Sequence, residues 1–583
     1  MAHTVWPSLT FPPGTVPYDG TAPRPRHCAR EVSTPDLHWN LPTTESAKPV
    51  TTIDFNTASA VARVARTSPN AVALVYEDRS ITYCELVEQA SRTATVLSED
   101  GVREGDRVAY TGFNSPAFLI TFLAANSLGA VFVPVNFRLT ELEVAALLAD
   151  AGAHVVVSEP GHVPVVDGVA DATHLNRFIV VDDDPAAPLV EPVGPRWSRL
   201  SERIAAVQPS GPPRRRAEND LALLIYTSGT TGRAKGVMLT HGNIWWNGTN
   251  VDSVVDTHTG NVNLAVAPMF HIGGLNAFTL RSLAGGGTTV LRRTFDPRRA
   301  LEDLVHYRVS TFFAVPAMFA AMSRVDGFDD ADLSGLHAAV VAGAPVPPGL
   351  IRQYAARGIE LQQAWGLTET APFATYLPPE LTETKCGSAG LPMPYTEIRL
   401  VDAVTTAPIE THSTLGEVWV RGPNVAAGYW QNASASAEAF VGDGWFRSGD
   451  IGYLDADGYL YIADRLKDMI ISGGENVYPA EVEAVLTEHP NLLEVAVVGT
   501  TDEQWGETVV AVVVSDGSHA PSLDEIQEFA GQSLARYKLP RRVVHIDTMP
   551  RNASGKLDKK GVRALVRDMD SSTASTLTSL ATS

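Results

Sequence analysis

Residues 221–236 read LALLIYTSGTTGRAKG, an apolar run that passes directly into Gly, Ser and Thr residues around one amine, Lys235. The apolar run predicts a buried strand, and the small residues after it let backbone N–H groups and hydroxyls converge on an anion. The Walker A pattern does not fit, because Lys235 follows Gly232 by three residues and precedes Gly236. Composition alone also allows a surface linker, but a linker does not normally follow a buried strand so abruptly. We therefore predict a phosphate-binding loop at a strand end.

The segments on both sides of this loop alternate between strand-like and helix-like patterns. Apolar runs such as RVAYTG, AVFVPV and HVVVSE are followed by helical stretches such as AFLITFLAANSLG and ELEVAALLADAG. The same alternation continues through TTVLRR, PRRALEDLVHY, STFFAVP and LHAAVVAGAP. This order predicts an α/β fold with parallel sheets covered by helices.

The pattern changes twice in the last third of the chain. From about residue 400, short alternating strands (EIRLVDA, GEVWVRG, GYLYIADR) predict a small antiparallel β subdomain. After DRLKD (464–468), helical and strand-like segments predict a smaller, mobile α+β domain. The predicted organisation is an extended arm (1–50), a large domain (51–466), a small C-terminal domain (467–567) and a disordered polar tail (568–583).

Composition bounds the possible partners. The chain has 583 residues, is 44% hydrophobic and 19% charged, and carries a formal net charge of −21, which argues against nucleic acid or an anionic membrane as the main partner. Three cysteines without metal-like spacing fit a reducing compartment. Neither a secretory signal nor a membrane span is predicted, so a cytoplasmic location is expected. The oligomeric state stays open.

Six motifs in the same order resemble those of the adenylate-forming superfamily, closest to its acyl-CoA synthetases (acid–CoA ligases). They are YTSGTTGRAKGV (226–237), AWGLTET (364–370), GEVWVRG (416–422), WFRSGDIG (445–452), DRLKDMIISGGENVYP (464–479) and PRNASGKLDK (550–559). The resemblance implies activation of a carboxylic acid by ATP, with Mg²⁺, to an acyl-adenylate and pyrophosphate. The acyl group is then transferred to the thiol of CoA.

The resemblance also assigns roles to individual residues. Thr368 contacts the α-phosphate and Glu369 a Mg²⁺ ion, whereas an isolated Glu is more often a solvated surface charge. Asp450 binds the ribose hydroxyls, Trp365 stacks on adenine, and Arg465 contacts ribose or phosphate. The implied ATP-binding set is Thr227, Ser228, Gly229, Thr230, Thr231, Lys235, Gly343, Ala344, Pro345, Trp365, Gly366, Asp450 and Arg465.

Lys556 is implied to be the catalytic lysine, although an ordinary surface lysine is far commoner. Because it stands in the terminal domain, that domain has to move to bring it to the site. Lys467 occupies the implied hinge position, which also suits an exposed linker charge. The segment Gly473, Gly474 and Glu475 is implied to line a passage for the thiol during the second step.

PMFHIGGLNAF (268–278) resembles one wall of the acyl pocket, with His271, Gly273 and Gly274 as its site residues. It holds no Asp to pair with a substrate ammonium, and an unpaired buried charge is costly. This favours a fatty, aromatic or arylalkenoic acid, and the two glycines are expected to leave space for it. His271 gates the acyl site or has a packing role; the sequence leaves both open.

The sequence leaves open which group accepts the activated acyl group. The tail after Lys556 is too short for a carrier-protein domain, so the thiol is expected in trans, as CoA or on a separate carrier protein. A stand-alone adenylating enzyme that passes the activated group to a carrier protein, an amine or another nucleophile is the nearest rival. A non-catalytic scaffold is a third possibility, disfavoured because Lys235, Glu369, Asp450 and Lys556 are all present.

Overall fold

The computed structural model describes residues 53–189, 193–228, 234–255, 257, 260–472, 475–502, 505–517, 519–552 and 556–569. The predicted N-terminal arm lies outside these residues, as does the predicted tail from residue 570. Asp568 and Met569, which the prediction assigns to the tail, still belong to the helix over 559–569.

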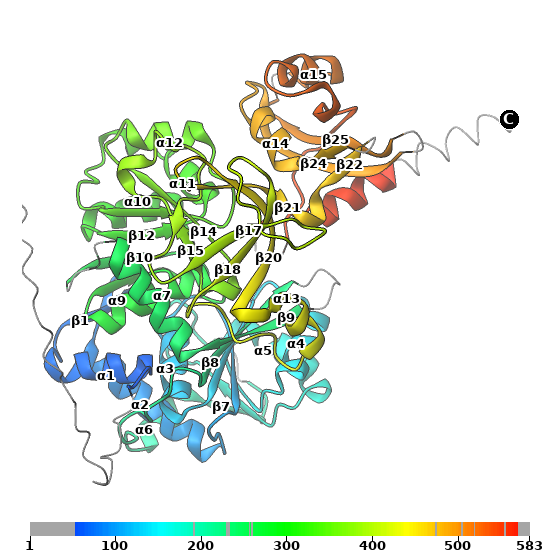
Figure 1. Cartoon of the computed structure of the whole chain (residues 1–583). Helices are drawn as coiled ribbons and strands as arrows, with labels where there is room; N and C mark the ends of the chain where they lie inside the picture. The colour runs from blue at the N-terminus through cyan, green and yellow to red at the C-terminus, as the bar shows by residue number, and fades with distance from the viewer. Residues whose placement is uncertain are drawn as a thin grey trace, which may run out of the picture. The chain divides into compact units, whose positions relative to one another are not determined.

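A seven-stranded sheet carries the strand that precedes the phosphate loop (Figure 1). Its strands run in the order β7-β6-β5-β3-β4-β8-β9, and all neighbours are parallel except β8 and β9. The helices that alternate with them are α2 (Tyr83–Glu99), α3 (Pro116–Leu128), α4 (Glu141–Ala151), α5 (Val163–Val169) and α6 (Leu200–Ala206). The strands are β3 (Arg107–Thr111), β4 (Val131–Val135), β5 (Val155–Ser158), β6 (Arg177–Val180), β7 (Trp197–Arg199), β8 (Leu221–Ser228) and β9 (Ala234–Thr240).

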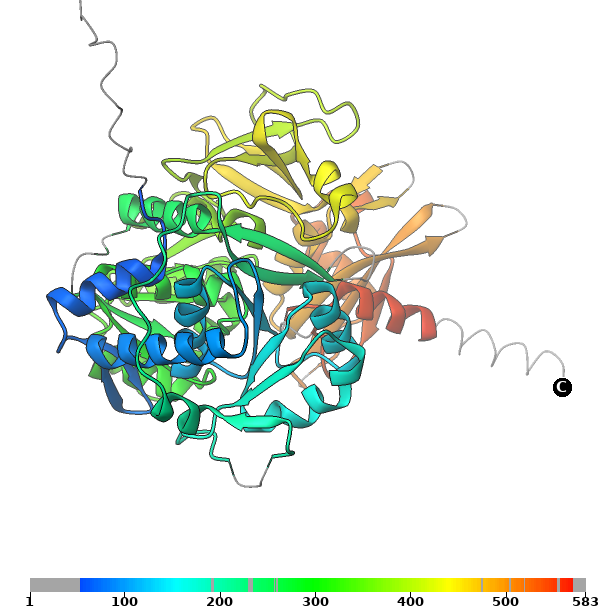
Figure 2. The same cartoon turned by 90° about the horizontal axis from the view of Figure 1, so that it is seen from below.

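A nine-stranded sheet forms the second layer, in the order β16-β15-β14-β13-β12-β10-β11-β1-β2, with a parallel centre and antiparallel edges (Figure 2). Its strands are β1 (Val72–Tyr76), β2 (Arg79–Thr82), β10 (Val262–Ala265), β11 (Thr288–Leu291), β12 (Thr311–Ala314), β13 (Ala338–Val341), β14 (Leu361–Gly366), β15 (Phe373–Tyr376) and β16 (Leu391–Pro392). The accompanying helices are α1 (Thr57–Thr67), α7 (His241–Val254), α8 (Ile272–Asn276), α9 (Thr279–Gly285), α10 (Pro297–His306), α11 (Pro316–Met322) and α12 (Pro348–Ala355).

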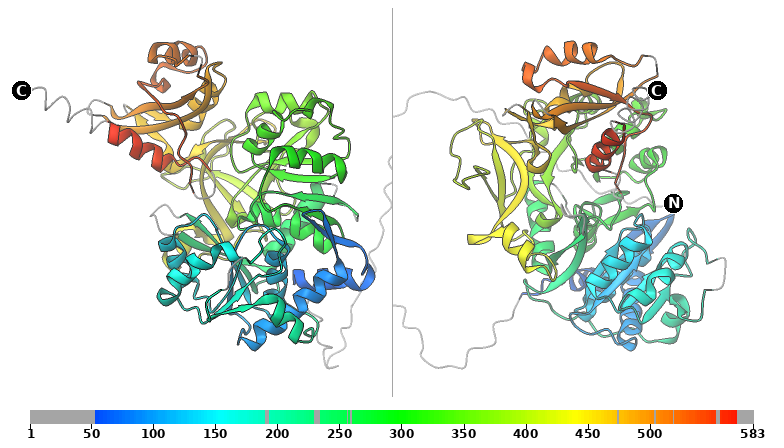
Figure 3. Two further views of the ribbon diagram at one scale, coloured as in Figure 1. Left: turned by 180° about the vertical axis from the view of Figure 1, so that it is seen from behind. Right: turned by 90° about the vertical axis from the view of Figure 1, so that its right-hand side faces the viewer.

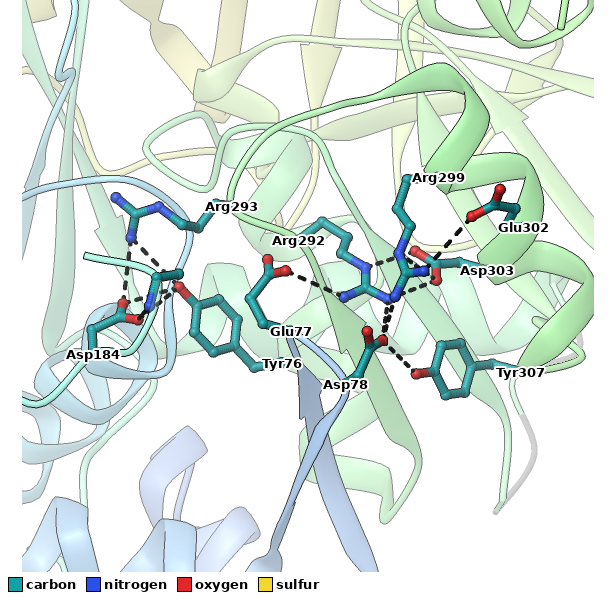
Figure 4. A network of polar contacts seen from close by, with 11 residues as sticks. Tyr76, Glu77, Asp78, Asp184, Arg292, Arg293, Arg299, Glu302, Asp303 and Tyr307 are labelled. Carbon is teal, nitrogen blue, oxygen red and sulfur yellow. Dashed lines mark hydrogen bonds and ion pairs between the residues drawn. The ribbon is translucent and has the colours of Figure 1, made fainter. Parts of the chain in front are cut away.

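One continuous apolar core joins the two sheets. It includes residues of β1, β3 and β8 together with α2 and α3, and ten residues of α3 are buried. Buried and half-buried charges reinforce the junction: Arg293, after β11, pairs with Glu159 (2.6 Å) and Asp184 (3.3 Å), which follow β5 and β6. Tyr76 at the end of β1 donates to the same Asp184 at 2.9 Å (Figure 4). Charged groups buried in such pairs are costly to separate, so they fix one sheet against the other.

An antiparallel sheet follows in the sequence, in the order β17-β18-β20-β19 with β21 beside β20. It contains β17 (Glu397–Val401), β18 (Gly416–Arg421), β19 (Phe440–Val441), β20 (Trp445–Leu454) and β21 (Leu460–Arg465), with α13 (Ala433–Ala439) preceding β19. The segment FRSGD of the WFRSGDIG motif is part of the long strand β20. Alternating burial of its side chains and pairing on both sides hold it extended.

The last sheet, orange in Figure 3, has the order β23-β22-β25-β24, with β26 parallel to β25. Its strands are β22 (Ile470–Ser472), β23 (Glu475–Val477), β24 (Leu492–Asp502), β25 (Gly506–Ser515) and β26 (Arg542–His545), with helices α14 (Pro479–Thr487) and α15 (Leu523–Gly531). The predicted boundary at Leu466 to Asp468 falls on a single turn of 3-10 helix, Leu466–Asp468, between β21 and β22. The predicted α/β fold class, with antiparallel sheets towards the C-terminus, is confirmed.

Candidate active site

The strand β8 and its antiparallel neighbour β9 position the phosphate-loop residues that the structure describes. Thr227 lies opposite Lys235 in the ladder, so the hydroxyl-bearing end of one strand faces the amine of the other. The Lys235 ammonium lies 4.9 Å from the centre of the Tyr429 ring, a cation–π distance. Gly229, Thr230 and Thr231 lie outside the described residues, and of Ser228 only the backbone, at the end of β8, is described.

Glu369 is buried on a turn of 3-10 helix, Thr368–Thr370, just after β14. Tyr429 donates its hydroxyl to Glu369 Oε1 at 2.9 Å, and Glu369 O accepts from the Ala426 N–H at 2.8 Å. Burial raises the pKa of the Glu369 carboxyl, while the Tyr429 hydrogen bond and the charges of Arg465 and Lys235 counteract the rise. Tyr429 is thus a site residue that the sequence motifs missed. It stands sixty residues beyond Glu369, and no local pattern marks it.

Asp450 lies on β20 and is 3% exposed. Its Oδ2 accepts from Trp365 Nε1 at 2.9 Å, and its Oδ1 lies 2.5 Å from Arg465 Nε, on the paired strand β21. The arginine contact is an ion pair whose angles leave Oδ1 without a hydrogen-bond donor. Burial raises the pKa of Asp450, against the Arg465 charge. Both carboxylate oxygens are thus held in place, Oδ2 by Trp365 and Oδ1 by the charge of Arg465.

Lys556 reaches this cluster from the other side. Its ammonium lies 3.9 Å from the place that a Cβ atom would occupy on Gly343, at the carboxyl end of β13. The lysine loop is tied at its base, since Lys556 N donates to Asn552 Oδ1 and Asn552 N to Lys556 O. Packing of protein around the ammonium lowers its pKa, and Arg465 lowers it further, while Asp450 opposes this.

Gly343, Ala344 and Pro345 form an exposed turn after β13. Gly343 has φ +88°, a conformation that side chains disfavour, so a glycine suits this turn. Thr368 and Gly366 are half-buried next to Trp365 at the end of β14. Direct contacts join Trp365, Asp450 and Arg465, and Lys556 lies beside Gly343, whereas Lys235, on another sheet, contacts Tyr429, the residue that donates to Glu369.

His271 and Gly273 are half-buried where α8 begins. His271 Nε2 is buried without a hydrogen-bond partner in the described part of the chain, and burial, with the charges of Lys556 and Arg138, lowers the pKa of His271 to about 3. The expectation that Gly273 and Gly274 leave space is wrong for both: a Cβ would lie 2.8 Å from the Phe313 ring at Gly273 and 2.3 Å from Pro268 O at Gly274. At Gly274 the missing side chain permits close backbone packing instead.

Two predicted residues lie apart from the cluster. Lys467 is exposed on the 3-10 turn before β22, and Glu475 is exposed at the start of β23, opposite Ser472. Within the described residues, neither side chain shares the hydrogen bonds and ion pairs of Glu369, Asp450 and Arg465. Gly473 and Gly474 lie outside the described residues.

The described residues contain neither a protein-only metal site nor a membrane-spanning helix. Among the described residues, no three His, Cys, Asp or Glu side chains lie close enough together to hold a metal ion by themselves. None of the described helices has both the length and the apolar character needed to cross a membrane.

The site and the two-part fold define the class of protein: the chain belongs to the AMP-binding enzyme family. The family model matches residues 61–430, and the model of the AMP-binding enzyme C-terminal domain matches residues 481–556. The predicted family is therefore confirmed.

Two relatives and one solved structure are similar to this chain over most of its length. The chain is 42% identical to a feruloyl-CoA synthase of Amycolatopsis sp. over 506 residues, which cover 86% of this chain and 97% of that protein. It is 39% identical to an indoleacetate–CoA ligase of Aromatoleum aromaticum over 506 residues, with the same coverage. It also resembles the structure of o-succinylbenzoate CoA synthetase from Bacillus subtilis in complex with its acyl-adenylate intermediate, with a TM-score of 0.75, 31% identity, and coverage of 86% of this chain and 96% of that one.

Proposed function

We propose that this protein is an ATP-dependent, AMP-forming acid–CoA ligase whose acid carries an aromatic ring, as arylacetic and arylalkenoic acids do. In the first step a carboxylate oxygen attacks the α-phosphorus of ATP, and the bond to the bridging oxygen breaks with loss of pyrophosphate. In the second step the thiol sulfur of CoA attacks the acyl carbon, and AMP leaves.

The convergence of Lys556 with Asp450, Arg465 and Glu369 carries the proposal. These residues come from distant parts of the chain, yet the charge of Arg465 influences the pKa of each of the other three. A cluster of this composition offers cations to a polyphosphate and an acceptor to ribose. Aligning a carboxylate with a polyanion and neutralising the charge are the main demands of the first step.

The nucleotide occupies the strand ends around Asp450. Its ribose hydroxyls donate to the Asp450 carboxylate, which Trp365 and Arg465 orient. Trp365 and the Gly343–Pro345 turn hold the adenine, while Arg465 contacts ribose or phosphate. The phosphate loop with Lys235 binds the β- and γ-phosphates, through Thr227, Ser228, Gly229, Thr230, Thr231 and Lys235.

Glu369 fits a Mg²⁺ ion that ATP brings with it. Mg²⁺ commonly takes only one or two protein carboxylates and completes its shell with phosphate oxygens and water. A single buried carboxylate with a raised pKa gains most from such a cation. The bound ion supplies charge neutralisation at the phosphates, while Tyr429 fixes Glu369 Oε1 through its hydroxyl.

Lys556 stabilises the charge that develops between the attacking carboxylate and the leaving pyrophosphate, and Thr368 contacts the α-phosphate. Lys556 is exposed as a residue, but its ammonium lies beside Gly343, and desolvation together with the charge of Arg465 lowers its pKa. The small domain then rotates about Lys467 and withdraws Lys556. The segment Gly473, Gly474 and Glu475 replaces it and guides the thiol.

The acid side of the site is apolar. Phe270, Leu275 and Phe278 beside His271 are all buried, and with its pKa near 3 His271 is neutral at physiological pH. The aromatic ring of such an acid therefore meets a neutral imidazole, and its carboxylate is the only charge it brings. The names of two relatives refer to ferulate and indoleacetate, both aromatic acids, and this also supports the proposal.

The test measures acid-dependent pyrophosphate release and AMP release over a panel of cinnamic, arylacetic, fatty and amino acids. Each acid is assayed with CoA, with a phosphopantetheinylated carrier protein, and with neither. Thioester formation on CoA with aromatic acids is the expected result. AMP release with thioester on the carrier protein alone would support the stand-alone adenylating alternative, and a preference for amino acids would overturn the assignment of the acid.

A further inference from the structure

The last turn of helix α4 holds two segments of the chain through one residue, Asp150. Its Oδ2 atom accepts a hydrogen bond of 2.7 Å from the Tyr226 hydroxyl, on β8. Its main-chain oxygen accepts a second one of 3.1 Å from Trp430 Nε1. The carbonyl oxygens in the last turn of a helix lack partners within the helix, so this oxygen can accept from another segment. Tyr226 and Trp430 also pack against the apolar cluster that includes Leu147 and Ala151 of α4.

The two aromatic residues meet at Gly236, which follows Lys235 on β9. Tyr226 pairs with Gly236 across the hairpin of β8 and β9, and Trp430 N donates to Gly236 O at 2.7 Å. A Cβ atom on Gly236 would lie 3.0 Å from Tyr226 Cζ and 3.3 Å from Trp430 Cβ. The missing side chain therefore lets both aromatic residues close over the strand that carries the phosphate-loop lysine.

Tyr429, the residue before Trp430, connects this contact to the rest of the site. Its segment runs antiparallel to β9, with a bridge between Tyr429 and Val237. The Tyr429 ring lies 4.9 Å from the Lys235 ammonium, and its hydroxyl donates to Glu369 Oε1 at 2.9 Å. A shift of Trp430 would therefore move the side chain that stands between these two charged groups.

We propose that Asp150 is a positioning residue for the ATP-dependent half-reaction. It fixes the phosphate-loop hairpin through Tyr226 and the segment of Tyr429 through Trp430, so that Lys235 and Glu369 act on the same polyphosphate. The second half-reaction does not need this arrangement, because pyrophosphate has left by then. The inference rests on the proposed acid–CoA ligase activity and adds a residue that acts through others.

The test measures kcat/KM for ATP in acid-dependent pyrophosphate release and, separately, the rate of thioester formation from preformed adenylate and CoA. Asp150→Ala and Trp430→Phe are each expected to lower kcat/KM about fivefold, the order of effect of one hydrogen bond, and to leave thioester formation within about twofold. Calorimetric titration with ATP and Mg²⁺ is expected to show weaker binding in both variants. Asp150→Asn, whose side-chain oxygen still accepts from Tyr226, is expected to stay near the wild-type values.

A double-mutant cycle tests whether Asp150 acts through Tyr226. Tyr226→Phe removes the same hydrogen bond as Asp150→Ala, so the double variant is expected to lose no more than either single variant. Additive losses would overturn the inference. An equal fall of both half-reactions in Asp150→Ala would also overturn it, because a general loss of stability has that effect.

Asp167→Ala is the matched control, because Asp167 accepts from Trp197 Nε1 at 3.0 Å at the other edge of the same sheet. It is expected to leave both half-reactions unchanged. Wild-type values in Asp150→Ala and Trp430→Phe, in an active enzyme, would overturn the inference alone. A wild-type enzyme that releases no pyrophosphate with any acid of the panel would overturn the proposed function as well, so the two failures are distinguishable.

Discussion

Trp365 and Asp450 lie on strands of two different sheets, β14 and β20, and a hydrogen bond of 2.9 Å from Nε1 to Oδ2 joins them. The other carboxylate oxygen of Asp450, Oδ1, lies 2.5 Å from Arg465 Nε in an ion pair. The same contact that orients the carboxylate therefore fixes the ring proposed to hold adenine. In the proposed function, Trp365 holds the base and Asp450 holds the sugar of the same nucleotide. Substituting one residue of this pair therefore tests the proposed site.

Trp365→Phe is expected to raise the KM for ATP about tenfold or more, because a hydrogen bond to a buried carboxylate contributes about 1.5–3 kcal/mol. Phenylalanine retains an aromatic face, so the change isolates the hydrogen bond. The measurement is the initial rate of pyrophosphate release against ATP concentration. Trp419→Phe is the matched control, since Trp419 Nε1 donates to Glu417 at the same distance, 2.9 Å. An equal rise of KM in both variants contradicts the assignment.

Lys556→Ala is expected to slow adenylate formation by about 100-fold or more, the usual loss when one electrostatic donor is removed from a developing charge. Thioester formation from preformed adenylate and CoA is expected to stay within about twofold. Both half-reactions are measured in single turnovers. Lys560→Ala, at an exposed lysine on the following helix, serves as control. A loss of both half-reactions in Lys556→Ala counts against a step-specific role.

The rate of the first half-reaction should depend on pH through the protonation of Lys556. Its pKa is lowered by packing around the ammonium and by Arg465, so the ammonium loses its proton at a lower pH than an ordinary lysine. The rate of adenylate formation should therefore fall as pH rises through that lowered pKa. Lys556→Arg, which keeps its charge, should react more slowly at neutral pH but lack this alkaline decline. A decline that persists unchanged in the arginine variant rules out Lys556 as its origin.

Glu369→Gln is expected to abolish Mg-dependent activity and yet raise the melting temperature of the ligand-free protein at pH 7 by a few degrees. Burial raises the Glu369 pKa above its unfolded value, so the ionised form costs folding free energy at neutral pH. That cost is absent below the unfolded pKa, so the gain should vanish near pH 4. Calorimetry at both pH values measures it. Glutamine still accepts the Tyr429 hydrogen bond, so lower stability at pH 7 would contradict this account.

The sequence predicted the parallel sheets well, because each buried strand is an apolar run and each helix has its own periodicity. β8 is an example: its apolar run predicts the strand, whereas β9, which pairs antiparallel with it, was not predicted. In β20, the small and polar residues FRSGD do not indicate a strand, and pairing with β18 and β21 keeps them extended.

Contacts between distant segments explain what the motifs left out of the site. Tyr429 touches Glu369 only because the chain brings together two segments sixty residues apart. For Gly274 the motif indicated a small residue correctly, but the space is filled by the backbone of Pro268. A sequence pattern indicates the size and chemistry of a residue. Tertiary packing determines which neighbouring group contacts that residue.

The position of Lys556 has a consequence for protein synthesis. A nascent chain that has emerged as far as β26 already contains Lys235, Glu369, Asp450 and Arg465, and so holds every proposed nucleotide contact of the large domain. It lacks the lysine proposed to complete the reaction, which lies beyond β26. Because it holds the proposed nucleotide contacts without the proposed catalytic lysine, we expect such a chain to bind ATP without consuming it. Translation itself thus delays the first chemical step until the part that delivers the thiol has also been made.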